Sequence, residues 1–279
     1  MISLKENINL FLSFLDKNRG YSKSSLITYE QALREMEEVS HFYQEDTKMV
    51  LDIRPFRLKV IDNSKRTISK KLSAVRSLLK YLHQQQGLDI ELIGDGVIKV
   101  PKTLPKPIDE RVILEALEVA NPKQRLIVLL LYGLGLRISE LATIRLDSIG
   151  SEWITVQGKG SKERQVPFVE GLYEELVYYI DLEKPKEFLF EKRGEKMSSY
   201  QIRYLFEKLF KSRGFKATPH QLRHSFATHL LHNGARITDV SKLLGHSSLV
   251  STQVYTKLEK SKKLNEYNQA HPLCDLKCL

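Results

Sequence analysis

The stretch from Thr218 to Tyr255 constrains the fold most, because short apolar-periodic segments alternate in it with glycines. Thr218 is a residue type that caps helices and Gly234 is the type that ends them, so a helix is predicted between them. A second helix is predicted over 237–244. The core-facing stripe of the first helix consists of Leu222, Phe226, Leu230 and Leu231.

Polar residues of the same stretch gather at helix faces and ends. His220 and Arg223 are three apart and therefore share one helical face. His246 follows Gly245, which sets it just past the end of the second helix, and Tyr255 comes nine residues later. One short segment thus supplies a guanidinium, two imidazoles and a phenol.

Two motifs upstream add further charge. The sequence GLGLRISEL places Arg137 at the start of a predicted helix over 137–145, with Glu140 one turn on as an ion-pair partner. The sequence QGKGSKERQVP places Lys159 at the tip of a predicted β-hairpin, and Lys162 is its rival there. For each of these residues taken alone, an exposed or ion-paired structural role is the simpler interpretation.

Taken in order, six residues resemble the signature of tyrosine site-specific recombinases of the Xer/integrase type. They are Arg137, Lys159, His220, Arg223, His246 and Tyr255. The resemblance is specific from 137 to 255, whereas the chain before residue 100 resembles the family only in pattern. It implies an enzyme that breaks and rejoins DNA strands through a 3′-phosphotyrosyl intermediate.

The resemblance also implies a role for each residue. Tyr255 is the nucleophile, and it needs a cationic site because a free phenol has a pKa near 10. Arg137 and Arg223 bind nonbridging phosphate oxygens, which suit the planar fork of a guanidinium. Lys159 gives a proton to the departing 5′ oxygen.

The histidines divide into two groups. The resemblance makes His220 a general base toward the tyrosine and His246 a donor to a nonbridging oxygen. The remaining three of the stretch are interpreted as helix-surface or packing residues; they are His224, His229 and His232. No metal is expected, because Gln221 stands where an HExxH zinc motif has glutamate. No cofactor is expected either, since a covalent intermediate conserves the energy of the phosphodiester bond.

The charge balance agrees with a nucleic-acid partner. The 279 residues include 44 Lys and Arg against 34 Asp and Glu, a formal net charge of +10. Such an excess favours a polyanionic partner, although a merely basic protein has the same composition. The predicted helix over 64–86 carries a basic outer face opposite Leu72, Val75, Leu79 and Leu82. The basic residues expected to contact DNA are Lys65, Arg66, Lys70, Lys71 and Arg76, together with Lys162.

A solvated lysine face is the ordinary interpretation of such a helix. Phosphate contact is preferred here because segment 64–82 resembles part of the family's N-terminal domain, which clamps DNA opposite the catalytic domain. The basic, proline-rich sequence KVPKTLPKP over 99–107 is interpreted as an extended linker.

The expected fold is therefore mainly α-helical with one small antiparallel β-sheet, in two domains. These are a helical DNA-clamping domain over 1–98 and a catalytic domain over 108–279. The other predicted helices cover 3–18, 22–39, 49–62, 109–120, 122–132, 172–182, 198–211 and 258–268. The predicted strands cover 153–157, 163–168 and 187–190.

The resemblance favours an Xer-like enzyme that resolves chromosome dimers as a homo-tetramer on a double-stranded DNA site, with or without a second recombinase or activating protein. A mobile-element or phage-type integrase, a relaxing topoisomerase of type IB and a non-catalytic DNA-binding protein stay open. No signal peptide or membrane span is expected, and sparse cysteines favour the cytoplasm. Cys274 and Cys278 with His271 form a possible metal set, but a frayed tail is preferred.

Overall fold

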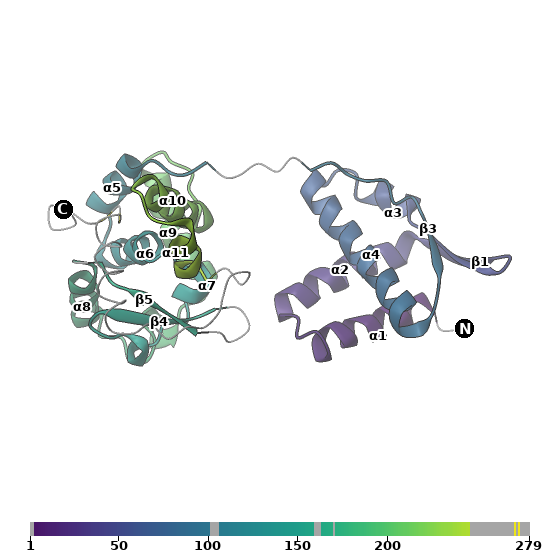
Figure 1. Cartoon of the computed structure of the whole chain (residues 1–279), viewed down its shortest axis with the longest axis horizontal. Helices are drawn as coiled ribbons and strands as arrows, with labels where there is room; N and C mark the ends of the chain where they lie inside the picture. The colour runs from purple at the N-terminus through teal and green to yellow at the C-terminus, as the bar shows by residue number, and fades with distance from the viewer. Residues whose placement is uncertain are drawn as a thin grey trace. The chain divides into compact units, whose positions relative to one another are not determined.

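The computed structural model describes residues 3–100, 106–158, 163–169 and 171–245, together with 271 and 273. The chain divides into two compact units, Met1–Thr103 and Leu104–Leu279 (Figure 1). Each unit has its own cluster of buried apolar side chains. None of the helices in the described ranges has the length and apolar content needed to cross a bilayer. The functional boundaries expected at 98 and 107 remain predictions.

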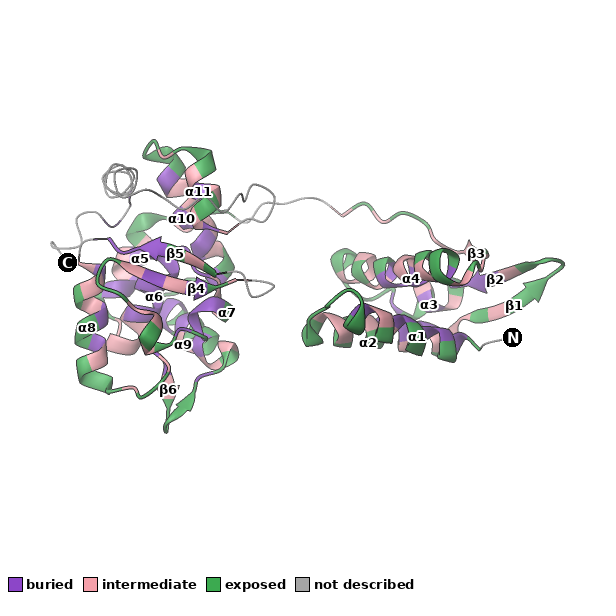
Figure 2. Ribbon diagram, turned by 60° about the horizontal axis from the view of Figure 1, so that its bottom comes forward, coloured by how far each residue is buried: buried purple, intermediate pink, exposed green. Residues whose placement is uncertain are grey.

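Four helices form most of the N-terminal unit. They are α1 (Leu4–Lys17), α2 (Lys23–Val39), α3 (Arg54–Lys59) and α4 (Lys65–Gln86). Serine side chains at 3, 22 and 64 accept hydrogen bonds from the first turns of α1, α2 and α4. Helices α1 and α2 pack on α4, and their apolar faces meet around Ile8, Leu33 and Val75 (Figure 2). The helices expected over 3–18, 22–39 and 64–86 are confirmed.

The same unit contains a three-stranded sheet that the sequence analysis missed. Its strands are β1 (His41–Glu45), β2 (Lys48–Asp52) and β3 (Ile90–Ile93), in the order β1-β2-β3. Strand β2 pairs antiparallel with β1 and parallel with β3. The prediction of a helical segment over 49–62, with a break at Pro55, is therefore wrong for residues 49–52, whereas α3 lies within the remainder of that segment. A three-residue apolar run, Met49 to Leu51, does not distinguish strand from helix, and pairing with distant residues decides the conformation.

Helix α6 (Pro122–Gly133) is the centre of the C-terminal unit. Every residue from Leu126 to Gly133 is buried, as expected of a helix that is apolar all round. It packs against α8 (Leu172–Glu183), α9 (Ser199–Ser212) and α10 (Pro219–His232). The preceding helix is α5 (Glu110–Glu118). Before it, the Ile108 amide donates a hydrogen bond to the buried Ser225 hydroxyl of α10 at 2.7 Å.

The predicted hairpin is confirmed. Strands β4 (Trp153–Gln157) and β5 (Glu163–Pro167) pair antiparallel, with Trp153 opposite Pro167. The fold is mainly helical, and it contains the small antiparallel sheet that was expected, β4-β5. A second, unpredicted hairpin joins β6 (Glu191–Lys192) to β7 (Glu195–Lys196).

Two expected elements are shorter than predicted, for one shared reason. The helix over 137–145 contains only α7 (Ile138–Leu141), followed by a 3-10 turn, η1 (Leu146–Ser148). The strand over 187–190 contributes only an isolated bridge between Phe188 and Arg145. The Leu189 amide donates to Ile144 O at 2.9 Å, and the Leu146 amide donates to Glu187 O at 3.0 Å. This pairing removes the backbone of 144–146 from the helix.

Candidate active site

Arg137 caps the short helix α7, where its predicted partner holds it. Its backbone amide donates to Glu140 Oε2 and its Nη1 to Oε1, both at 2.8 Å. The tight turn before it depends on Gly135, whose φ is +58°. A Cβ on Gly135 would lie 2.4 Å from the Phe226 ring. The ion pair expected from the sequence is therefore present, and the Arg137 side chain keeps 40% of its surface exposed.

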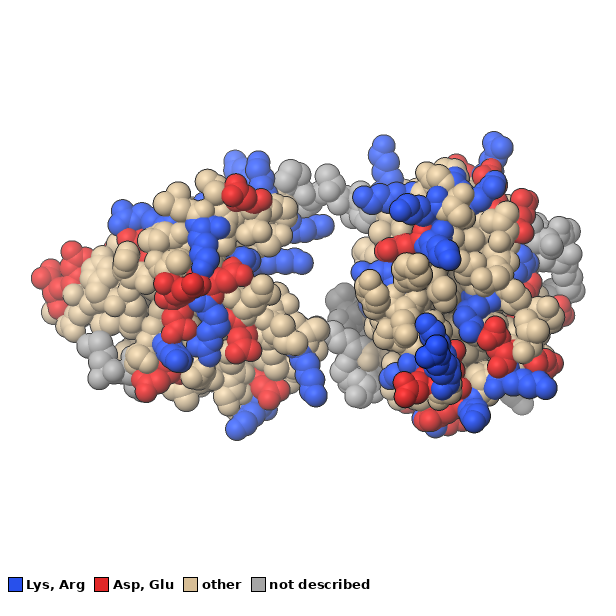
Figure 3. All heavy atoms as spheres, turned by 180° about the vertical axis from the view of Figure 1, so that it is seen from behind, with Lys and Arg blue, Asp and Glu red and all other residues tan. Residues whose placement is uncertain are grey.

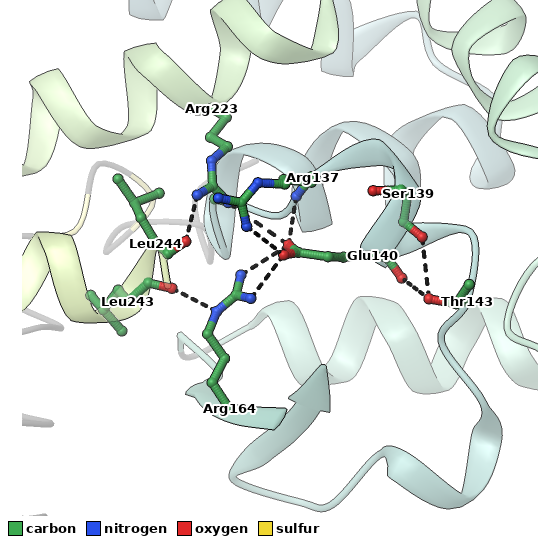
Figure 4. A network of polar contacts seen from close by, with 9 residues as sticks. Arg137, Ser139, Glu140, Thr143, Arg164, Arg223, Leu243 and Leu244 are labelled. Atoms are coloured by element: carbon green, nitrogen blue, oxygen red, sulfur yellow. Dashed lines mark hydrogen bonds and ion pairs between the residues drawn. The ribbon is translucent and has the colours of Figure 1, made fainter. Parts of the chain in front are cut away.

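Glu140 is shared by three arginines (Figure 4). Arg164 of β5 binds it through two parallel hydrogen bonds, from Nη1 to Oε1 and from Nη2 to Oε2, both at 2.9 Å. Nη1 of Arg223 lies 3.8 Å from Oε2. The Glu140 side chain is only 3% exposed. We call Arg137, Glu140, Arg164 and Arg223 the arginine cluster.

Arg223 is buried on α10 and also binds backbone carbonyls. Its Nη1 donates to Gly135 O at 2.5 Å, and its Nη2 donates to Leu244 O. Arg164 Nε donates to Leu243 O at 2.9 Å. The Leu243 and Leu244 carbonyls belong to the C-terminal end of α11 (Ile237–Leu243). The two arginines therefore hold the end of the helix that leads to the predicted residue His246.

The arginine cluster carries excess positive charge, because three guanidinium groups face one carboxylate. Burial alone raises the pKa of Glu140, but hydrogen bonds from Arg164 and Arg137 outweigh it and hold that pKa below its usual value. Burial, and then the neighbouring charge of Arg137, lowers the pKa of Arg223 to about 10. A bound anion would relieve this repulsion, so the cluster suits a phosphate.

His220 lies in the first turn of the helix that carries Arg223. The Thr218 hydroxyl caps this helix, as predicted, by accepting from the Gln221 amide at 3.2 Å, and Pro219 follows at its first position. His220 is exposed, whereas Arg223 is 5% exposed. The structure thus brings Arg137 and Arg223 together, with His220 one turn away from Arg223.

The other predicted site residues lie outside the described residues. They are Lys159, Lys162, His246 and Tyr255. Their described neighbours are Gly158 and Glu163 beside the hairpin tip, and Gly245 at the end of α11. The catalytic roles of Lys159, His246 and Tyr255, and the DNA contact of Lys162, remain predictions.

Arg164 is not among the predicted site residues, although strand alternation carried a signal for it. Arg164 and Val166 are two apart on β5, so both side chains point to the same face. Val166 is fully buried. A charged residue on the buried face of a strand needs a partner, and here the partner is Glu140.

Two histidines have buried partners. His229, expected at a surface or in packing, packs against Tyr132, whose hydroxyl lies 2.7 Å from His229 Nδ1. Burial lowers the pKa of His229, while Glu110, 3.6 Å away, opposes the shift. His271, expected in a frayed tail, is instead fully buried beside Phe226.

The tail expectation is therefore wrong at His271. Its Nδ1 accepts from the Leu273 amide at 3.0 Å, so its Nε2 carries the proton and donates to Gly133 O at 2.7 Å. Gly133 ends the buried helix α6, and the tail contains no periodic pattern that predicts this contact. Among the described residues, no group of three or more His, Cys, Asp or Glu is placed to hold a metal ion. Cys274 and Cys278 lie outside them.

The basic residues of α4 differ in their surroundings. Lys65, Arg66 and Lys70 are exposed. Lys71 instead forms an ion pair with Glu35, and Arg76 binds Asp95 through Nε at 2.8 Å and Nη2 at 2.7 Å. Figure 3 shows basic and acidic side chains interspersed on one face of both units. Any DNA-contacting surface on α4 is therefore narrower than its sequence suggests.

The fold and the arginine cluster define the class of protein. The fold is that of the integrases: a lambda integrase tetramer bound to a Holliday junction aligns with a TM-score of 0.71, covering 91% of this chain and 81% of that one at 16% identity. The cluster adds an anion-receptive site within the integrase-like C-terminal unit.

Sequence comparison then gives the family. The model of the "Phage integrase family" matches residues 107–262, and that of the "Phage integrase, N-terminal SAM-like domain" matches 8–86. Tyrosine recombinase XerC of Bacillus subtilis is 31% identical over 300 residues, covering 98% of both chains. Tyrosine recombinase XerA of Thermococcus kodakarensis is 38% identical over 206 residues, covering 70% and 72%. The chain belongs to the phage integrase family, as an Xer-like tyrosine recombinase that cleaves and religates DNA strands.

Proposed function

We propose that this chain recombines double-stranded DNA at a specific site and resolves chromosome dimers in the cytoplasm. The arginine cluster carries the proposal, because its excess charge sits beside the end of α11 at Leu243, twelve residues before Tyr255 in the sequence. The XerC name of the Bacillus subtilis relative supports the recombinase role.

The proposed reaction conserves the phosphodiester bond energy. The Tyr255 oxygen attacks phosphorus while the bond to the 5′ oxygen breaks, and a 3′-phosphotyrosyl link forms. Arg137 and Arg223 bind the nonbridging oxygens of the crowded transition state. His220 accepts the phenolic proton, Lys159 protonates the leaving oxygen, and His246 donates to a nonbridging oxygen. The 5′-hydroxyl of a second duplex then attacks the link and releases Tyr255.

The proposed division of labour follows the two units. Residues 1–98 clamp the DNA and 108–279 hold the catalytic groups, joined by the linker 99–107. Lys65, Arg66 and Lys70 are exposed and suited to phosphate contact. Lys162 is proposed to contact DNA beside Lys159. Lys71 and Arg76 contribute less, because Glu35 and Asp95 balance their charges.

The proposed active assembly is a homo-tetramer on DNA, with segment 258–268 linking neighbouring subunits. The lambda integrase tetramer on a Holliday junction supports this assembly. A purified chain that recombines two sites by itself needs no second recombinase or activator. A requirement for an added factor would identify such a partner.

A suicide substrate tests the chemistry. DNA with a nick next to the cleavage site loses the 5′-hydroxyl fragment, so the phosphotyrosyl adduct accumulates and survives denaturation. We expect adduct with the wild-type chain and none with Tyr255→Phe. The matched control is Tyr200→Phe, since Tyr200 is 77% exposed on α9. Adduct that persists in Tyr255→Phe excludes this nucleophile.

Mapping adducts across genomic DNA provides the substrate and tests the biological role. A single preferred chromosomal site supports dimer resolution, whereas sites at the ends of a mobile element favour an integrase. The similarity to a Tn1549 transposon integrase, with a TM-score of 0.65 at 19% identity, makes this second role worth testing. Recombinant product from two mapped sites distinguishes recombination from DNA relaxation alone.

A further inference from the structure

We propose that Arg164 is a positioning residue for DNA cleavage, which holds Arg137, Arg223 and the segment before His246 in one fixed arrangement. The inference rests on the proposed function and adds a residue to it. Arg164 does not bind the phosphate in this arrangement. All three of its side-chain nitrogens bind protein oxygens, Nε to Leu243 and both Nη atoms to Glu140.

Arg164 joins three parts of the site. It lies on β5, two residues after Lys162 at the predicted hairpin tip. Through Glu140 it reaches Arg137 at the start of α7. Through the Leu243 carbonyl it reaches the end of α11. Among the described residues, no other makes hydrogen bonds both to Glu140 and to this helix end. Arg223 binds the helix end through Leu244 O, but its Nη1 lies 3.8 Å from Glu140 Oε2, too far for a hydrogen bond.

The end of α11 is shaped around the Arg164 guanidinium. Gly245 has a φ of +62°, and a Cβ there would lie 3.2 Å from Arg164 Cδ and 3.3 Å from its Nη1. Glycine therefore allows the chain to pass closely over the arginine. The Leu244 carbonyl between Leu243 and Gly245 binds Arg223. The backbone leading to His246 is thus fixed by two arginines that share one carboxylate.

Arg164 also limits how strongly Glu140 attracts Arg137 and Arg223. It occupies one position on each carboxylate oxygen. Without it, Glu140 would face Arg137 and Arg223 alone, and Arg223 Nη1 would be drawn across the present 3.8 Å to Oε2. That movement would take Arg223 from Gly135 O and Leu244 O and from the expected phosphate position. A displacement of about 1 Å at such a site costs about 100-fold in rate.

Lysine cannot replace Arg164 in this geometry. A single ammonium makes neither the parallel pair of hydrogen bonds to Glu140 nor the simultaneous bond to Leu243 O. Arg164→Lys therefore keeps the positive charge but loses the simultaneous hydrogen bonds to Glu140 and Leu243 O. It separates positioning from simple charge balance, and it carries the test if Arg164→Met does not fold.

The experiment measures adduct formation by the full chain on the nicked suicide substrate at saturating DNA. The variants are Arg164→Lys and Arg164→Met. The matched control is Arg145→Met, which removes another ion-paired arginine of the same unit, bound to Asp147 and Glu187. DNA affinity and melting temperature are measured for each variant. A second substrate carries a methylphosphonate at the cleaved position, which removes the negative charge that the arginines are placed to bind.

We expect both Arg164 variants to form adduct about 100-fold more slowly on the phosphodiester. The DNA affinity of both variants should stay within about 3-fold of the wild-type affinity, since Arg164 makes no phosphate contact. The control, Arg145→Met, should form adduct within about 3-fold of the wild-type rate, because an exposed ion pair contributes little to stability. On the methylphosphonate the deficit of the Arg164 variants should shrink to less than about 10-fold, because misplaced arginines matter less there.

Three outcomes would overturn the proposal. One is a wild-type rate in either Arg164 variant that folds. Another is an equal deficit on both substrates with a lowered melting temperature, which would make Arg164 only a stabilising residue. The third is a parallel loss of DNA affinity, which would make it a direct phosphate contact. Failure of the proposed function itself looks different, because the wild-type chain would then form no adduct.

Discussion

At the scale of single residues, Glu140 is the one carboxylate that holds three guanidinium groups together. We expect Glu140→Gln to lower the free energy of unfolding of the C-terminal unit by about 3 kcal/mol, since breaking a buried ion pair leaves uncompensated charge. Urea unfolding followed by fluorescence measures this, because the single tryptophan, Trp153, lies on β4 of that unit.

The control is Glu183→Gln, which breaks the more exposed pair with Lys123 and should cost about 0.5 kcal/mol. Equal effects of the two substitutions would mean that Glu140 is not the electrostatic centre of the arginine cluster.

His271 provides a pH dependence at the same scale. Burial lowers its pKa in the folded protein to about 4, while its hydrogen bond to Gly133 O opposes the shift. The unfolded chain therefore takes up the proton first as the pH falls below about 6.5. The contribution of the neutral His271 to the free energy of unfolding is therefore fully present above about pH 6.5 and is lost as the pH falls towards 4. This contribution amounts to about 3 kcal/mol.

Urea midpoints at pH 7, 6, 5 and 4 check this expectation. His271→Gln should lose less stability over the interval than the wild type, because glutamine does not titrate. Parallel pH curves for the two proteins would show that His271 does not take up its proton on unfolding.

Single residues were predictable where a motif or a spacing marked them. The motif singled out Arg137, and the spacing of three identified Glu140 as its partner. Arg223 was found by its place on a helix whose apolar face was already clear. His271 was not predictable, because its burial depends on Gly133, far away in the sequence. Arg164 was predictable in part. Strand alternation placed it on the same face as Val166, but its partner Glu140 was not evident from the sequence.

At the scale of elements, the turn between α6 and α7 depends on Gly135. Alanine there meets both a left-handed backbone and the Phe226 ring, 2.4 Å away. Gly214 after α9 also has a positive φ, +79°, but nothing lies within 4 Å of its missing Cβ. We expect Gly214→Ala to cost about 1 kcal/mol from backbone strain alone. Gly135→Ala should cost about 1–3 kcal/mol more through overpacking, as measured by urea unfolding.

Similar costs for both alanines would mean that Phe226 moves aside freely. Since Gly135 O also accepts from Arg223, the adduct assay of Gly135→Ala should show a rate loss that Gly214→Ala lacks.

The basic face of α4 makes a second prediction at this scale. Replacing two exposed lysines of this helix, Lys65 and Lys70, with glutamine should lower the slope of log affinity against log salt by about 2. Replacing Lys71 and Arg76 should change the slope less, because Glu35 and Asp95 already bind them. DNA titrations at several salt concentrations measure both slopes. Equal changes for the two pairs would refute the distinction between free and paired charges.

Helices with both a cap and a long apolar period were predictable, as α1, α4 and α10 show. Short elements were not. Strand β2 depends on pairing with β1 and β3, and the early end of α7 depends on pairing between 144–146 and 187–189. Both outcomes are set by residues distant in sequence, which local periodicity does not register.

At the scale of the whole molecule, each unit closes its own core. We expect urea unfolding to show two transitions, because the units do not share a described apolar cluster. Fluorescence of Trp153 reports on the C-terminal unit, whereas circular dichroism reports on the helices of both. The two signals should therefore not coincide. Coincident curves at every pH would mean that the units unfold as one.

The hydrogen bond from the Ile108 amide to the Ser225 hydroxyl bears on how the protein is made. A nascent chain completes its N-terminal unit by Thr103. The C-terminal unit is completed later, because Ser225 and Leu273 must be synthesised before they can make their contacts with its earlier residues. A chain that stops before residue 223 lacks Arg223 and therefore cannot assemble the arginine cluster, although its N-terminal unit is complete.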